Sequence, residues 1–119
     1  MFGESLSGVG VRGVSFGAQS AVQAVGSKLA LDVRGVTRFN RSGSVTIKGT
    51  SSTAVVSVPG GVTASTLAFA MLQTNLADVY VRAVVPQPAA GKLTIVLNKA
   101  PGSANGVARS VKAAWFVVG

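Results

Sequence analysis

The side chains that most often carry out catalysis are nearly absent from this chain of 119 residues. It has no histidine and no cysteine, and its only carboxylates are Glu4, Asp32 and Asp78. A serine nucleophile normally relies on a histidine base, and an acid–base pair needs two carboxylates close together in space. We therefore expect a protein that is not an enzyme. A Ser–Lys dyad, for example at Ser44 or Ser110, is the one nucleophilic arrangement that this composition leaves open.

Two further patterns bear on metals and cofactors. In an oligomer, Asp32 or Asp78 could meet its own copies around an axis and bind a cation, but pairing with a nearby arginine, such as Arg34 or Arg38 for Asp32, is the simpler expectation. Residues 8–13 fit the spacing Gly-x-Gly-x-x-Gly, yet a dinucleotide site needs a preceding strand and a following helix, and a valine repeat follows here. We expect neither a metal nor a cofactor.

The chain is strongly basic, with a net charge of +8 from 11 lysines and arginines against three acids. Such a balance is typical of proteins with acidic partners, including nucleic acid and anionic polysaccharide. The basic residues are scattered singly and aromatic residues make up only 6% of the chain, so a solvated surface of strands and turns is the simpler expectation. If the charge serves binding, we expect an anionic surface glycan and not nucleic acid. The predicted binding residues are Tyr80, Arg82, Lys92, Lys99 and Arg109.

The elements that must position these residues begin with an internal repeat. A Val-x-Gly/Ala-Val unit recurs every eleven residues within residues 8–36. Its β-branched and glycine residues favour short β-rungs of a solenoid or triple β-helix over a helix, although 18–25 has some helical propensity. Such thin rungs cannot bury their apolar sides alone, so they need a stacked neighbour or another copy of the chain. The predicted interface residues are Val11, Val14, Val22, Val25, Val33, Val36, Phe39 and Trp115.

Residues 44–119 are expected to form an antiparallel β-sandwich with a jelly-roll-like arrangement, with a small barrel as the alternative, after a stalk and junction that occupy residues 1–43. Six runs of alternating or continuous apolar residues are separated by glycine, proline and asparagine turns; they span residues 44–48, 53–58, 64–75, 79–85, 92–98 and 110–118. The run at 64–75 is apolar on both faces, as in a strand buried in an oligomer, and a helix is its alternative. Trp115–Val118, at the end of the 110–118 run, carries no charge, so this strand must lie centrally in its sheet or between subunits.

Several segments together resemble the C-terminal regions of phage tail-fibre and tail-spike-like proteins, which are also similar to parts of large actinobacterial surface proteins. They are Gly8–Ser15, Ala30–Gly43, Leu93–Pro101 and Ala113–Val118, and the resemblance extends over nearly the whole chain. It implies a parallel homotrimer in which a β-helical stalk is capped by three sandwiches. This chain departs from the pattern in having about three rungs and a longer loop at 102–108. The resemblance carries over no catalytic residue.

These observations lead to one prediction of function and two alternatives. We expect a non-enzymatic structural and attachment protein, the tip or knob of a trimeric fibre, which binds a cell-surface glycan or protein through loops at 73–78, 86–91 and 99–109. The alternatives are a capsid-associated or cementing trimer and a basic nucleic-acid-binding module. No apolar run is long enough to span a membrane, and no signal peptide is visible. The resemblance implies a location that is extracellular or on a virion surface.

Overall fold

A computed structural model describes residues 16, 24–27, 29, 31–37 and 39–119. The chain divides into two compact units, Met1–Thr37 and Arg38–Gly119. The second unit is all-β, and its described part contains no α-helix.

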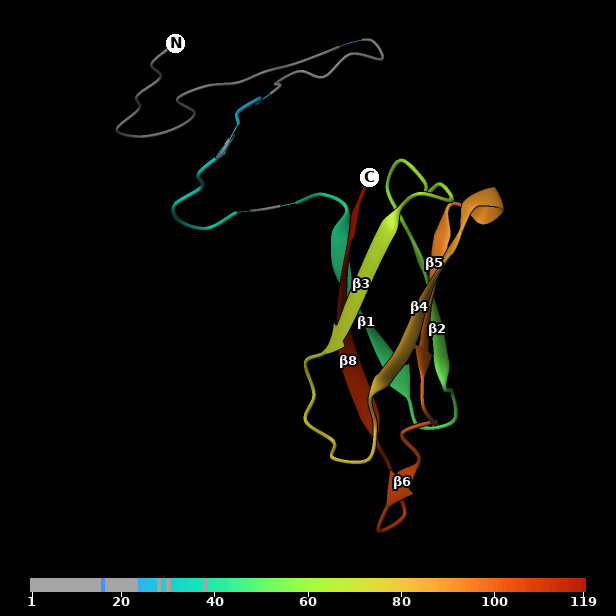
Figure 1. The fold of residues 1–119 in the computed structure, drawn as a ribbon. Coiled ribbons are helices and arrows are strands. Elements are labelled where there is room, and N and C mark those ends of the chain that lie inside the picture. The colour runs from blue at the N-terminus through green and yellow to red at the C-terminus, as the bar shows by residue number, and fades with distance from the viewer. Residues whose placement is uncertain (1–15, 17–23, 28, 30, 38) are drawn as a thin grey trace. The chain divides into compact units, whose positions relative to one another are not determined.

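Two antiparallel sheets form this second unit (Figure 1). Sheet A has the order β1-β8-β3, and sheet B has the order β2-β5-β4. The six strands are β1 (Ser42–Lys48), β2 (Thr53–Ser57), β3 (Leu67–Leu72), β4 (Val81–Gln87), β5 (Lys92–Leu97) and β8 (Ser110–Val118). A short 3-10 turn, η1 (Pro88–Ala90), joins β4 to β5, and a small hairpin of β6 (Ser103–Ala104) and β7 (Val107–Ala108) precedes β8.

The core follows from the two-residue alternation of the strands. Leu93, Ile95 and Leu97 of β5 are buried, while the residues between them are partly exposed. Val111, Ala113, Trp115 and Val117 of β8 are buried in the same way. Because each sheet turns one apolar face toward the other, the pair encloses a single hydrophobic core. The sandwich predicted from the sequence is confirmed at this level.

Strand β8 is central in sheet A, with β1 on one side and β3 on the other. This position confirms that the uncharged end of the chain is not an open edge. The run at 64–75 contains a strand, not a helix, although the strand is limited to Leu67–Leu72. The stretch 99–108, expected to be a loop, carries the β6–β7 hairpin, whose turn places Asn105 at a φ of 51° and Gly106 at 75°.

The first unit is described only in part. Val11, Val14 and Val22 of the predicted rungs lie outside the described residues. The described residues between 24 and 37 contain no strand, and Val25, Val33 and Val36 are exposed. In the part of the chain that the structure describes, no helix is long and apolar enough to cross a membrane.

Candidate interaction surface

The outer face of sheet A carries a stripe of large apolar side chains that no other part of the sandwich covers. We call this stripe the apolar face; its members are Leu67, Phe69, Met71, Phe116 and Val118, which are between 45% and 74% exposed. The first three alternate along β3 and the last two along β8, where each lies opposite or beside a β3 member. The same alternation that sends Ala68, Ala70, Trp115 and Val117 into the core therefore sends these residues outward.

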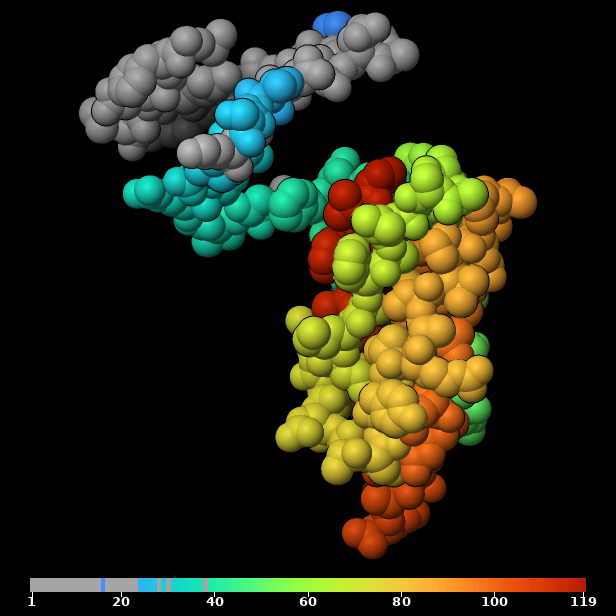
Figure 2. All heavy atoms as spheres, in the orientation of Figure 1, coloured from blue at the N-terminus to red at the C-terminus, as the bar shows by residue number. Residues whose placement is uncertain are grey.

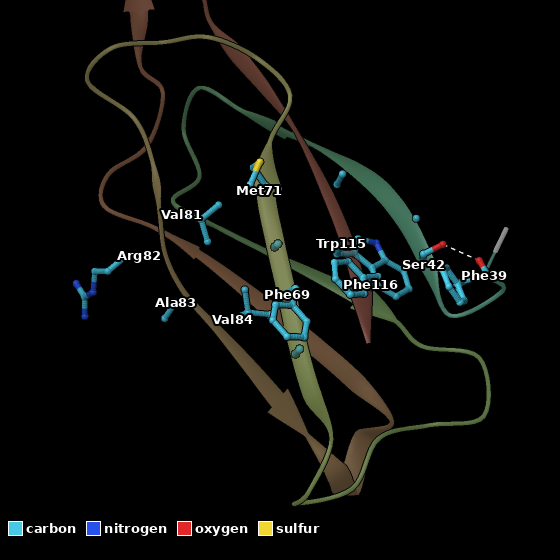
Figure 3. Close-up of a pocket in the computed structure, with 14 residues that line it drawn as sticks. Phe39, Ser42, Phe69, Met71, Val81, Arg82, Ala83, Val84, Trp115 and Phe116 are labelled. Carbon is cyan, nitrogen blue, oxygen red and sulfur yellow. Dashed lines mark hydrogen bonds between the residues drawn. The ribbon is translucent and has the colours of Figure 1, made fainter. Parts of the chain in front are cut away.

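The centre of the apolar face is a pair of stacked aromatic rings. Phe69 and Phe116 are directly opposite in the β3–β8 register, and their ring centroids are 4.7 Å apart with an interplanar angle of 9°. Ser42 of β1 is opposite Phe116 on the other side. Its hydroxyl donates a hydrogen bond of 2.6 Å to the carbonyl of Phe39, an exposed aromatic residue that enlarges the apolar surface (Figure 3).

A hollow of about 820 Å³ adjoins this surface. Phe39, Phe69 and Phe116 line one part of it, and Val81 and Val84 of β4 line another. The hollow thus continues from the outer face of sheet A around β3 to the neighbouring edge of sheet B, as the close-up in Figure 3 shows for these side chains. Most of the side chains that line it are apolar, and Ser42 and Arg82 are the exceptions.

The size of the apolar face distinguishes it from ordinary surface. Its five residues expose on the order of 600 Å², which is at the upper end of the largest apolar patch on a typical monomer and not far below the ~800 Å² that one partner contributes to a standard interface. The lysines on this side of sheet A, Lys48 and Lys112, lie toward the opposite end of the strands. An apolar protein surface fits this stripe better than a glycan, because few polar groups are present to bind hydroxyls.

A second cluster lies at the end of the sandwich below β3 and β4 in Figure 1. The Arg109 guanidinium donates two hydrogen bonds to Asp78, at 3.3 Å to Oδ1 and 3.2 Å to Oδ2, and Lys99 Nζ is 2.8 Å from Asp78 Oδ2. The hydrogen bonds from Arg109 and then from Lys99 hold the pKa of Asp78 well below its usual range. The cluster joins the loop after β3 to the hairpin segment before β8.

Asn98 extends this cluster toward Tyr80. Its side-chain amide donates to the carbonyl of Asp78 at 3.0 Å and accepts from the backbone N–H of Tyr80 at 2.9 Å. The loops at 73–78 and 99–109 therefore meet at one end of the sandwich, and the loop at 86–91 lies at the other (Figure 1).

The five predicted binding residues do not converge on one site. Tyr80, Lys99 and Arg109 lie around Asp78, where the two cations are already paired with its carboxylate. Arg82 is exposed at an irregularity in the β4–β5 register, and Lys92 lies at the far end of the same strand pair, opposite Ser57 and Gln87. Among the described residues, neither Arg82 nor Lys92 has a carboxylate partner.

The predicted interface residues are also separated. Trp115 is only 6% exposed and packs in the core, while Phe39 is 66% exposed and lines the hollow beside the apolar face. The neighbours Trp115 and Phe116 thus belong to opposite faces of β8. Sequence reasoning noted that the run containing β3 is apolar on both sides, but it did not assign Phe69 or Phe116 to the site.

Arg41 is a further residue that sequence reasoning missed. Its guanidinium donates to the carbonyls of Pro59 at 3.1 Å, Gly119 at 2.6 Å and Gly61. Two of the carbonyls belong to the turn after β2 and the third follows β8, so this side chain connects that turn to the end of β8. Arg41 is therefore structural, and its charge contributes less to the attraction of an anionic ligand.

The candidate chemistry at other positions is limited. Asp32 accepts a hydrogen bond of 3.2 Å from Arg34 Nε, which agrees with the expectation that Asp32 pairs with a nearby arginine. No group of three potential metal ligands is present among the described residues. No family model, no curated protein and no solved structure matches this chain.

Proposed function

We propose that this protein is a non-enzymatic structural and attachment protein that assembles with copies of itself into a homotrimeric fibre tip or knob. The observation that carries the proposal is the apolar face of sheet A. A patch of this area promotes association in water because about 25 cal/mol is gained for each Å² of apolar surface removed from solvent. The same strand that presents Phe116 also supplies the core through Trp115, so association through this face requires no rearrangement of the fold.

The net charge supports this face as the place of contact. Copies of a chain with charge +8 repel one another, and the repulsion is smallest where two surfaces meet without lysine or arginine. The part of sheet A around Phe69 and Phe116 is such a surface. Attachment to a target would then fall to the loop ends, where Arg82 or Lys92 can meet an anionic polymer on a cell surface.

A cementing trimer is the second candidate, and the same apolar face favours it. The two candidates differ only in whether the loop ends bind a soluble target. A nucleic-acid-binding module is less favoured, because Lys99 and Arg109 are engaged by Asp78 and Arg41 is engaged by carbonyls.

Light scattering on the full chain over a range of concentrations tests the assembly. A homotrimer has three times the mass of the 11.9 kDa chain, whereas a chain that keeps the monomer mass at every concentration would contradict the proposal. A glycan array read at low and high salt then tests attachment. Binding to anionic glycans that weakens with salt supports the fibre tip, and no binding to any glycan leaves the cementing trimer.

A further inference from the structure

A groove runs along the open side of the sandwich, between the edge strands β3 and β4. The 820 Å³ hollow and a second hollow of about 340 Å³ share Ala70, Met71 and Val81 in their walls, so the two form one depression along β3. We call this depression the edge groove. Figure 2 shows this side of the sandwich, with the residues of β3 and of β4 next to each other.

The backbone along the edge groove lacks strand partners. Among the described residues, β3 pairs only with β8, and β4 pairs only with β5. Each strand therefore presents one row of N–H and C=O groups toward its open side. Natural edges are usually protected by charge, proline or a bulge; β4 has Arg82 and Pro86, but Leu67–Leu72 of β3 has none of these.

The floor of the edge groove has room for added side chains. Its inward-pointing residues on β3, Ala68 and Ala70, are small, and those on β4 are Val81 and Val84. Six residues of extended chain span about 20 Å, which equals the length of β3. An occupant must therefore be an extended segment of about six residues whose alternate side chains are apolar.

Residues 29–34 of the chain itself have this pattern. Leu29, Leu31 and Val33 alternate with Ala30, Asp32 and Arg34, and the three apolar residues are 52% to 70% exposed. Asp32 and Arg34 contact each other, so the two charged side chains of this segment lie together and away from the three apolar ones. Gly35 follows with a φ of 117°, a conformation that favours glycine.

We propose that the edge groove accepts residues 29–34 of a second copy of the chain as an added β-strand. Leu29, Leu31 and Val33 would point into the groove, and the Asp32–Arg34 pair would remain in water. The backbone would hydrogen-bond to the open edge of β3 or β4, as in other cases of strand addition. This inference goes beyond the proposed function, since it concerns a strand added at the edge of the sandwich, although the edge groove shares Phe69, Met71 and Phe116 with the apolar face.

Disulfide trapping between two chains tests the proposal, and the natural chain has no cysteine to interfere. A Leu31→Cys chain carrying a mass tag is mixed with an untagged Ala70→Cys chain under mild oxidation. The matched control replaces the Ala70→Cys chain by Val55→Cys, which is exposed on the outer face of sheet B. We expect a cross-linked heterodimer with Ala70→Cys at several times the yield with Val55→Cys. Equal cross-linking yields with Ala70→Cys and Val55→Cys would overturn the proposal. It would also be overturned if a chain with both Leu31→Cys and Ala70→Cys formed its disulfide only within one chain.

The emission of Trp115, the only tryptophan, gives a second readout because its ring lines the edge groove. Because Trp115 is only 6% exposed, we expect a small shift in the emission of the full chain as concentration rises, and Leu31→Asp to abolish the shift. Val36→Asp, beyond Gly35, is the matched control and should keep it. A shift that survives Leu31→Asp would contradict strand addition. If the chain has the mass of a trimer but Leu31→Cys and Ala70→Cys chains do not cross-link, this inference is wrong and the proposed function stands.

Discussion

Phe69 of β3 and Phe116 of β8 lie opposite each other and stack at a centroid distance of 4.7 Å, yet each remains almost half exposed. Stacked aromatic pairs gain about 0.5–1.5 kcal/mol beyond the burial of their area. The part of both rings that remains exposed is removed from water only when another surface covers it. The outer face of sheet A is therefore the surface at which association is favoured, whereas other residues of the sandwich maintain the fold.

Asp78→Asn is expected to lower the melting temperature at neutral pH, because it removes the carboxylate that Arg109 and Lys99 share. The folded-state pKa of Asp78 is lowered, so its stabilisation is fully present above the unfolded carboxyl pKa of about 3.9 and declines as the pH falls below that value. Thermal unfolding of the wild-type and Asp78→Asn proteins from about pH 7 to about pH 2 should show that the difference between their melting temperatures becomes smaller as the pH falls.

The control for this substitution is Asp32→Asn. The Asp32–Arg34 pair is an exposed pair, with side chains 50% and 90% accessible, and pairs of this kind contribute little to stability. Its removal should leave the melting temperature unchanged at every pH. If Asp78→Asn leaves the melting temperature unchanged at every pH, as Asp32→Asn should, the Asp78–Arg109–Lys99 cluster does not stabilise the connection between the loops at 73–78 and 99–109.

Gly49→Ala is expected to destabilise the sandwich by about 1–3 kcal/mol, as overpacking typically does. A Cβ at Gly49 would overlap the carbonyl oxygen of Gly102, a backbone atom that also accepts the N–H of Arg109 at 2.8 Å. Urea unfolding measures the effect. Ser52→Ala, in the same turn, is the control and should change the unfolding free energy by less than about 0.5 kcal/mol.

Ile95→Ala tests the core that both sheets share. Ile95 is fully buried at the centre of β5, and truncation of such a residue typically lowers the unfolding free energy by about 2–5 kcal/mol. Val55→Ala, on the exposed side of the neighbouring strand β2, should have an effect below about 1 kcal/mol. Similar effects of the two substitutions in urea unfolding would contradict the assigned core.

The sequence was sufficient to predict the features that depend on local alternation. The runs at 92–98 and 110–118 were predicted correctly and contain β5 and β8, because a strand that is half buried repeats every two residues. The β6–β7 hairpin was missed, since strands of two residues leave no periodic pattern. The pairing of Asp78 with Arg109 joins positions 31 residues apart and arises only from the fold.

The site was predicted only in outline. An apolar pattern on both sides of β3 indicated an interface, but the partner of Phe69 depends on which strand lies beside β3, and that is decided by tertiary pairing. The eleven-residue repeat predicted rungs, whereas its described residues form no strand. A strand needs a backbone partner, and a local repeat does not supply one.

Sedimentation equilibrium of the Phe69→Ser/Phe116→Ser double variant tests the central claim most directly. Its matched control is Val55→Ser/Val85→Ser, which removes two similarly exposed apolar residues from the outer face of sheet B. With circular dichroism showing all proteins folded, the account predicts that the wild-type chain and the control have three times the mass of the 11.9 kDa chain and that the double variant falls toward 11.9 kDa. A double variant that keeps the wild-type mass, or a wild-type chain that is a monomer at every concentration, would contradict it.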